Sequence, residues 1–95
     1  MAKVTVEVYG HYATLAGKRK ETMEVPNPTI EGLLKRMQGS WSQRFMEEII
    51  DSKTKEPALD AMILLNNRSI YHLEGLKTEL KDGAIVVIMP AIAGG

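Results

Sequence analysis

The sequence predicts a single α+β domain, in which a mixed sheet is joined by one main crossover helix and a second short helix. Three observations favour this fold class. Apolar residues alternate at the start of the chain, recur with helical spacing from Ile30 to Met37, and run without interruption from Ala84 to Met89. With 95 residues, 44% of them hydrophobic and 25% charged, the chain has the size and composition of one ordered globular domain.

The start of the chain predicts a β-hairpin. Val4, Val6 and Val8 fall on one face of a period-two pattern, as in a half-buried strand. Residues 10–18 contain two glycines and break the alternation, so we expect a loop there. Residues 20–25 resume a strand-like composition, which predicts the second strand of the hairpin.

The main helix is expected directly after the hairpin. The Pro26-Asn27-Pro28 segment ends the second strand, and Thr29 is a favourable N-cap. Gly32 weakens the helix by about 1 kcal/mol relative to Ala, and Gly39 ends it. The apolar stripe of this helix consists of Ile30, Leu33, Leu34 and Met37.

A second, shorter helix is expected next. Ser40 and Gln43 have the spacing of a capping box, in which two side chains satisfy the first free N–H groups of a helix. Trp41, Phe45 and Ile49 would share the inner face of this helix.

The remaining chain predicts further strands. Polar residues 51–57 are expected to form a surface loop, and residues 62–65 a short strand. Asn66-Asn67 predicts a turn into a weaker strand over residues 69–72. After an Asp-Gly turn, the apolar run of residues 84–89 suits a central strand covered on both faces.

This order of elements favours the β-grasp, or ubiquitin-like, arrangement, in which the last strand inserts beside the first, although a ferredoxin-like or split α+β sheet would share parts of it. We expect a β-grasp domain over residues 1–89 and a C-terminal tail over residues 90–95 that ends in Gly-Gly.

Charge and composition exclude several classes of function. Twelve basic and twelve acidic residues give a net charge of zero, which argues against a nucleic-acid partner. The chain has no cysteine, no apolar signal-peptide core and no uncharged run near the ~20 residues that span a bilayer. We therefore expect a cytoplasmic protein with no membrane partner.

The usual catalytic devices are missing from the sequence. His11 and His72 have no neighbouring carboxylate at metal-ligand spacing, so no metal site is predicted. Glu47 and Glu48 are adjacent and would project about 100° apart on a helix, as on a solvated face. Turn chemistry accounts for the asparagines of the Asn66-Asn67-Arg68 segment, and no glycine-rich phosphate motif is present.

The tail is the feature that packing does not explain. It has no charged side chain, Pro90 stiffens its start, and Gly94 and Gly95 lack the Cβ atoms that would keep a partner away from the terminal carboxylate. That carboxylate is ionised at pH 7 and could attack the α-phosphate of ATP. Alternatively the tail is simply frayed, because many domains end in small residues, although two terminal glycines arise by chance in only about 0.5% of chains.

Several segments resemble the MoaD/ThiS family of ubiquitin-like sulfur carriers, and the MoaD branch most. The similarity includes the first strand and helix start, Leu15-Ala16-Gly17, Leu80-Lys81-Asp82-Gly83 and the ending Met89-Pro90-Ala91-Ile92-Ala93-Gly94-Gly95. The chain departs from the family at His11-Tyr12-Ala13, where Arg is frequent, and at Met89, where an aromatic residue is frequent.

The resemblance implies a role for the tail. An E1-like adenylyltransferase (MoeB/ThiF-like) would use ATP and magnesium to activate Gly95, and a sulfur donor would then convert it to a thiocarboxylate. The chain itself would bind no cofactor. Gly94 would allow close approach, and Pro90, Ala91, Ile92 and Ala93 would thread into the large subunit of molybdopterin synthase (MoaE-like), where sulfur passes to precursor Z.

The resemblance also implies a docking surface, at Tyr9, Ile70 and Met89, although ordinary sheet packing accounts for these residues equally well. Other functions stay open: sulfur transfer for thiamine or tRNA, conjugation of the tail to target lysines, or an interaction domain with incidental glycines.

Overall fold

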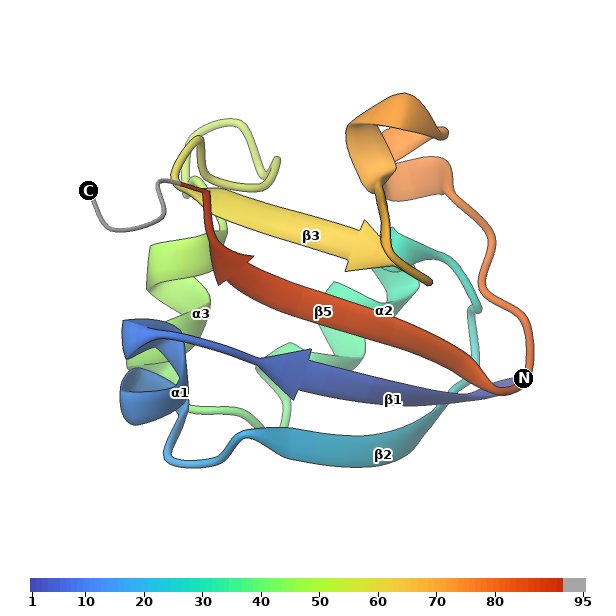
Figure 1. The fold of residues 1–95 in the computed structure, drawn as a ribbon, viewed down its shortest axis with the longest axis horizontal. Helices are drawn as coiled ribbons and strands as arrows, with labels where there is room; N and C mark the ends of the chain where they lie inside the picture. The colour runs from blue at the N-terminus through green and yellow to red at the C-terminus, as the bar shows by residue number, and fades with distance from the viewer. Residues whose placement is uncertain (92–95) are drawn as a thin grey trace.

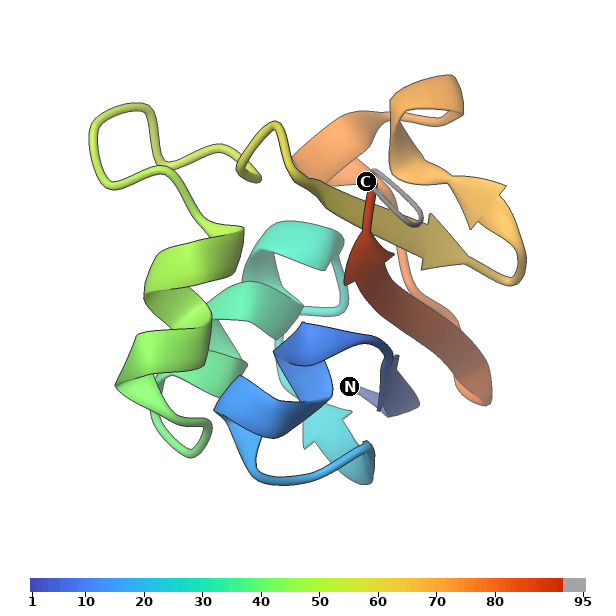
Figure 2. The same ribbon diagram turned by 60° about the vertical axis from the view of Figure 1, so that its left-hand side comes forward.

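The computed structural model describes residues 1–91, and these form a five-stranded mixed sheet with helices packed on one face (Figures 1 and 2). The strands are ordered β2-β1-β5-β3-β4. The elements are β1 (Ala2–Val8), α1 (His11–Ala16), β2 (Lys20–Val25), α2 (Ile30–Gln38), α3 (Gln43–Ile49), β3 (Ala61–Leu65), β4 (Arg68–Ser69), the 3₁₀ turns η1 (Ile70–His72) and η2 (Gly75–Lys77), and β5 (Ala84–Pro90).

The predicted hairpin and the insertion of the last strand are confirmed. β1 pairs with β2 in antiparallel fashion, and β5 lies parallel to β1 with Val6 opposite Val86. β5 also pairs antiparallel with β3, with Ile63 opposite Ile88, so it is the central strand (Figure 1). The predicted α+β, β-grasp class is therefore the observed fold, and β5 leads directly toward the C-terminus.

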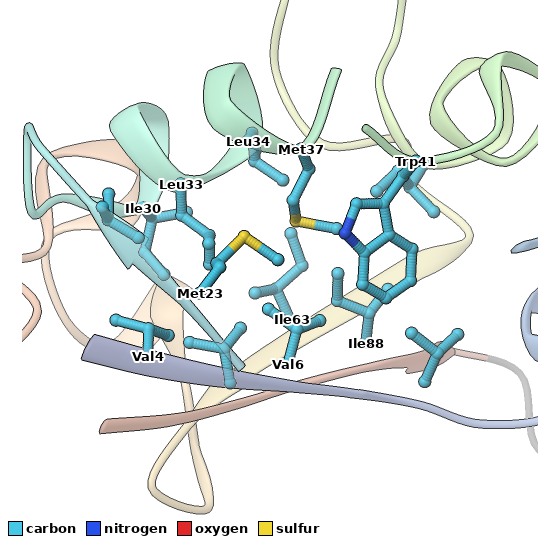
Figure 3. Close-up of a cluster of buried hydrophobic side chains, with 14 of the residues drawn as sticks. Val4, Val6, Met23, Ile30, Leu33, Leu34, Met37, Trp41, Ile63 and Ile88 are labelled. Atoms are coloured by element: carbon cyan, nitrogen blue, oxygen red, sulfur yellow. The ribbon is translucent and has the colours of Figure 1, made fainter. Parts of the chain in front are cut away.

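The core lies between the sheet and the helices, as Figure 3 shows. The valine face of β1 points into this core, as the period-two pattern predicted. Facing it are the apolar stripe of α2 and the inner face of α3. The largest buried side chains include Tyr12, Ile30, Leu33, Met37, Phe45, Ile49, Ile63, Ile70 and Ile88. The indole Nε1 of Trp41 is buried, and residues 1–91 supply no hydrogen-bond partner for it.

The start of α2 agrees with the sequence. Thr29 is the N-cap, and its Oγ1 accepts a hydrogen bond of 3.0 Å from the backbone N–H of Gly32. This bond satisfies one of the free N–H groups in the first helical turn.

We expect Thr29→Ala to lower the free energy of unfolding by about 1 kcal/mol, because the Gly32 N–H loses its acceptor. Urea unfolding would measure the difference. Thr29→Ser, which keeps the hydroxyl, should recover most of the loss, and equal losses for the two variants would contradict the capping role.

The start of α3 differs from the sequence-based expectation. The N-cap is Ser42, whose Oγ accepts a 3.3 Å hydrogen bond from the N–H of Phe45, whereas Ser40 lies before the helix and accepts from Arg36. The capping-box prediction at Ser40 is therefore wrong by two residues. Gln43 instead donates to Glu47 along the exposed side of α3.

The predicted loop over residues 10–18 is wrong, because it contains the short helix α1. Tyr12 and Ala16, one helical turn apart, are buried and hold α1 against the rest of the core. Gly17 ends the helix in the left-handed conformation (φ 75°), where its N–H bonds the carbonyl of Ala13.

Two expectations for the later strands also need correction. The weaker strand predicted over residues 69–72 is the two-residue β4 followed by the 3₁₀ turn η1. The Asn66-Asn67 turn is confirmed, with both residues at positive φ. β5 is central but is covered on one face only, since Ile85 is 43% exposed on the side away from the helices.

Candidate functional site

The structure describes the base of the predicted tail. Gly95 and Gly94, the predicted reactive residues, lie outside the described residues, as do Ala93 and Ile92 of the predicted threading segment. Pro90 is the last residue of β5 and pairs with Ala61 of β3, so the strand includes the first residue of the predicted tail. The chain therefore leaves the domain from the end of its central strand.

The hydrogen bonds at this exit come from three parts of the chain. The N–H of Tyr9, just after β1, donates to the carbonyl of Ile88 at 3.0 Å. The N–H of Ala91 donates to the carbonyl of Asp60 at 2.7 Å, and the Tyr12 hydroxyl donates to the same carbonyl at 3.2 Å. Both sides of the chain are thus anchored at the end of β5.

The Tyr12 hydroxyl stays protonated, and so remains a hydrogen-bond donor, at neutral pH. Burial, and secondarily the carboxylates of Asp60 and Glu48, raises the pKa of Tyr12 above its ordinary value of 10.0. The neutral phenol is therefore retained up to at least pH 10, and its contribution to stability would be lost only as the pH rises further through the folded-state pKa.

Gly10 makes a close contact with Pro90. Its backbone, with φ 68° and ψ −151°, occupies a conformation open almost only to glycine. A Cβ atom on Gly10 would lie 2.9 Å from Cγ and 3.0 Å from Cδ of the Pro90 ring. The turn from β1 into α1 therefore packs directly on the last residue of β5.

The open face of the sheet is apolar over β5 and β3. Met89 stands opposite Met62, and Val87 stands opposite Leu64, all partly exposed on the face without helices. Tyr9, which is 49% exposed, follows β1 beside the end of β5. Two of the predicted docking residues, Tyr9 and Met89, are thus brought together next to the exit.

Ile70 does not belong to this surface. It lies in η1 and is 0% exposed, so the expectation that Ile70 contacts a partner is corrected: its side chain is part of the core. Periodicity suggested a strand position there, but the 3₁₀ turn rotates this side chain inward. Val87 was missed because the apolar run of β5 was interpreted as buried on both faces. Met62 and Leu64 of β3 were missed because an apolar run of four residues does not show which of its side chains are exposed.

The other half of the open face is polar. Thr5 and Thr22 share a 2.9 Å hydrogen bond across β1 and β2, and Glu7 accepts one of 2.8 Å from the Tyr9 hydroxyl. The bond to Glu7 raises the pKa of Tyr9. The apolar area is thus confined to the half of the open face formed by β5 and β3.

A groove of about 810 Å³ lies between the end of β1, α1 and the start of β2. Lys18, Arg19 and Lys20 give its rim a positive charge, and Lys18 is paired with Glu21 while lying 4.4 Å from the centre of the Trp41 ring. No histidine is among the described residues that line the groove, and the Tyr9 hydroxyl there donates to Glu7, which raises the pKa of the phenol and so does not activate it as a nucleophile.

The histidines and the adjacent glutamates considered in the sequence lie on the surface. His11, His72, Glu47 and Glu48 are all exposed. In the part of the chain that the structure describes, residues 1–91, no three His, Asp or Glu side chains gather where a metal ion could bind. None of its helices has the length and apolar character needed to cross a bilayer.

Comparison with known proteins agrees with this architecture. The solution structure of small archaeal modifier protein 1 from Methanosarcina acetivorans is 27% identical, with a TM-score of 0.81 over 100% of this chain and 98% of that one. A candidate molybdopterin converting factor, subunit 1, from Pyrococcus furiosus is 28% identical, with a TM-score of 0.76 over 97% and 100%.

Sequence comparison gives the family. Small archaeal modifier protein 3 of Haloferax volcanii is 46% identical over 33 residues, so the chain matches 36% of the length of that protein and 35% of its own. The family model described as the ThiS family matches residues 6–95, almost the whole chain. The chain therefore belongs to the ThiS family of ubiquitin-like sulfur carriers and modifiers.

Proposed function

We propose that this protein is a sulfur carrier that acts as the small subunit of molybdopterin synthase, with Gly95 as the acceptor. The observation that carries the proposal is the route of the chain: the central strand β5 leads straight into a tail that ends in Gly-Gly. Membership of the ThiS family and the similarity to the Pyrococcus furiosus protein support it.

The proposed chemistry takes place at the terminal carboxylate. A carboxylate oxygen of Gly95 attacks the α-phosphorus of ATP and pyrophosphate leaves, which gives a mixed anhydride with AMP. A sulfur nucleophile from a donor, at the oxidation level of sulfide, then attacks the carbonyl carbon and AMP leaves, so that sulfur replaces one oxygen. An E1-like adenylyltransferase holds the ATP and magnesium.

In the last step, in the large synthase subunit, the thiocarboxylate sulfur bonds to a carbon of precursor Z and displaces an oxygen leaving group. Water then hydrolyses the resulting thioester, so that the sulfur stays on the product and the carrier leaves as the carboxylate. Gly94 matters here because the absence of a Cβ lets the walls of a narrow channel approach the reacting carbonyl. The chain contributes the nucleophile and its delivery, while its partners contribute the catalytic groups.

The test is a mass measurement on the intact protein. The chain is incubated with an activating enzyme of this class, ATP, magnesium and a sulfur donor. We expect the mass to rise by the difference between sulfur and oxygen, with the change located in the C-terminal peptide. An unchanged mass under conditions that thiolate a related carrier would refute the proposal.

A second candidate function is that of a protein modifier joined through Gly95 to target lysines. The specific observation in its favour is the similarity to small archaeal modifier protein 3. Both functions begin with the same adenylate, so they separate at the second step. Purification of the tagged chain from cells under denaturing conditions would distinguish them, because only the modifier remains attached to other proteins by isopeptide bonds.

The apolar half of the open face is the proposed docking surface for these partners. We expect Met89→Lys to raise the KM of the activating reaction by about 30-fold, as for an interface residue worth about 2 kcal/mol. Steady-state kinetics with the carrier as the varied substrate would measure the change.

Thr22→Lys is the matched control for Met89→Lys. It places the same charge on the polar half of the same face, where Thr22 is exposed. We expect its KM to stay within twofold of the original. Equal effects of the two variants would show that net charge, rather than the apolar surface, determines binding.

A further inference from the structure

We propose that Gly10, Tyr12 and the carbonyl of Asp60 form an exit clamp that aims the tail, and that Gly10 and Tyr12 are positioning residues for the reaction at the C-terminus. The inference rests on the proposed function, because it concerns how the terminal carboxylate is delivered. It goes beyond docking, since these groups lie at the end of β5 and not on the apolar open face.

One side of the exit clamp is the Gly10–Pro90 contact. The rigid ring of Pro90 packs so closely on Gly10 that even a methyl group there would come within 3.0 Å of two ring atoms. Gly10 is itself fixed between β1 and α1, and the neighbouring N–H of Tyr9 is bonded to Ile88. The last residue of β5 therefore cannot tilt toward α1.

The other side of the exit clamp is the carbonyl of Asp60. This carbonyl accepts from the N–H of Ala91 and from the Tyr12 hydroxyl. It lies in a turn closed by the hydrogen bond from Ala61 to Ala58. Tyr12 is 1% exposed, and its ring packs edge-on against Phe45 at 6.0 Å, so its hydroxyl has a fixed position.

Together the two sides determine the position and direction in which the chain leaves the domain. The first side comes from the turn into α1 and the second from the turn before β3, which are far apart in the sequence and are joined by the hydrogen bond from the Tyr12 hydroxyl to the Asp60 carbonyl. A carboxylate that must reach one phosphorus atom gains rate from being delivered in the right direction, and a displacement of about 1 Å can cost about 100-fold.

The first experiment removes one hydroxyl. Tyr12→Phe deletes the donor to Asp60 and keeps the buried ring. We expect the kcat of ATP–pyrophosphate exchange by the activating enzyme to fall about five- to tenfold, with KM unchanged within twofold, because the docking face is intact. Hydrogen exchange at the Ala91 amide should become faster, which reports on the exit independently of activity.

Tyr71→Phe is the matched control. Tyr71 is exposed, and no hydrogen bond of its hydroxyl is present among the described residues. It should leave kcat, KM and exchange at Ala91 unchanged.

The second experiment is a double-mutant cycle between Gly10→Ala and Pro90→Ala. Gly10→Ala adds backbone strain and a collision with the ring, while Pro90→Ala removes the ring atoms that the new methyl group would meet. The strain at Gly10 is common to both arms of the cycle and cancels, so the coupling isolates the contact. We expect the kcat of the double variant to be at least threefold higher than that of Gly10→Ala alone.

Any of three results would overturn the exit clamp. The first two are an unchanged kcat in Tyr12→Phe and an effect of Tyr12→Phe confined to KM. The third is additive effects of Gly10→Ala and Pro90→Ala on kcat. These results differ from a failure of the proposed function, because each compares the kcat of a variant with that of the unsubstituted chain, which is adenylated in the same assay. A chain that is never adenylated would instead refute the proposed function.

Discussion

Removal of Gly94 and Gly95 is expected to abolish adenylation and thiolation of the chain while leaving the domain folded. The shortened protein still ends in a carboxylate, so the loss cannot be attributed to a missing functional group. Two residues of extended chain span about 7 Å, and the new carboxylate would stop short of the α-phosphate by that distance. Intact-mass measurement and pyrophosphate exchange would both show no product above background.

Replacement of Gly94 by Val tests the second part of the same prediction. The length of the tail is preserved, but a branched Cβ stands next to the reacting carbonyl. We expect a rate at least about 100-fold lower, as for a reacting group displaced by about 1 Å. Removal of Met1, which is exposed at the other end of the chain, is the control for truncation. If the shortened chain is thiolated at the original rate, Gly95 is not the acceptor. If Gly94→Val is thiolated at the original rate, the absence of a Cβ at position 94 is not required.

Gly32→Ala is expected to have the largest effect on stability. A Cβ at Gly32 would lie 1.9 Å from the carbonyl oxygen and 2.9 Å from the carbonyl carbon of Asn27, so the backbone before α2 would have to move. That segment is fixed by the hydrogen bonds from Leu80 to Pro28 and from Ile30 to Thr78. We expect a loss of about 3–5 kcal/mol, a large part of the 5–15 kcal/mol that stabilises a typical domain.

The sign of this prediction is opposite to that of intrinsic propensity, by which Ala in a helix interior is about 1 kcal/mol better than Gly. Gly39→Ala is the matched control at the end of the same helix. Its φ is −82°, and the nearest atom to a new Cβ is 3.6 Å away, so we expect a change within about 0.5 kcal/mol or slight stabilisation. Urea unfolding of both variants measures the contrast, and similar midpoints would contradict it.

Gly32 also illustrates what the sequence could and could not predict. The stripe of α2 and its Thr29 cap follow from local spacing and were predicted within one residue. The reason for Gly32 is a contact with the Pro26-Asn27-Pro28 segment, which depends on how that segment turns back over the helix. The spacing of apolar residues along the sequence does not show this close contact.

The same distinction applies to the exit. That β5 lies beside β1 followed from the order of elements and the apolar composition of the last strand. The helix α1 was missed because six residues are too few for a periodic signal, although Gly17 after Ala16 has the pattern of a helix C-terminus. The meeting of Gly10 with Pro90 and of Tyr12 with Asp60 could not be predicted, since it joins positions distant in the sequence.

The central place of β5 has a consequence for biosynthesis. Val4 pairs with Ala84, so β1 is translated long before its partner β5. The β2–β1 and β3–β4 parts of the sheet can be joined only after β5 has left the ribosome. Folding is therefore completed only once nearly all of these residues have been translated. A polypeptide that ends before β5 would lack the strand that joins the sheet and would also lack the terminal glycines. We expect such a fragment to stay unfolded and to be degraded by proteases.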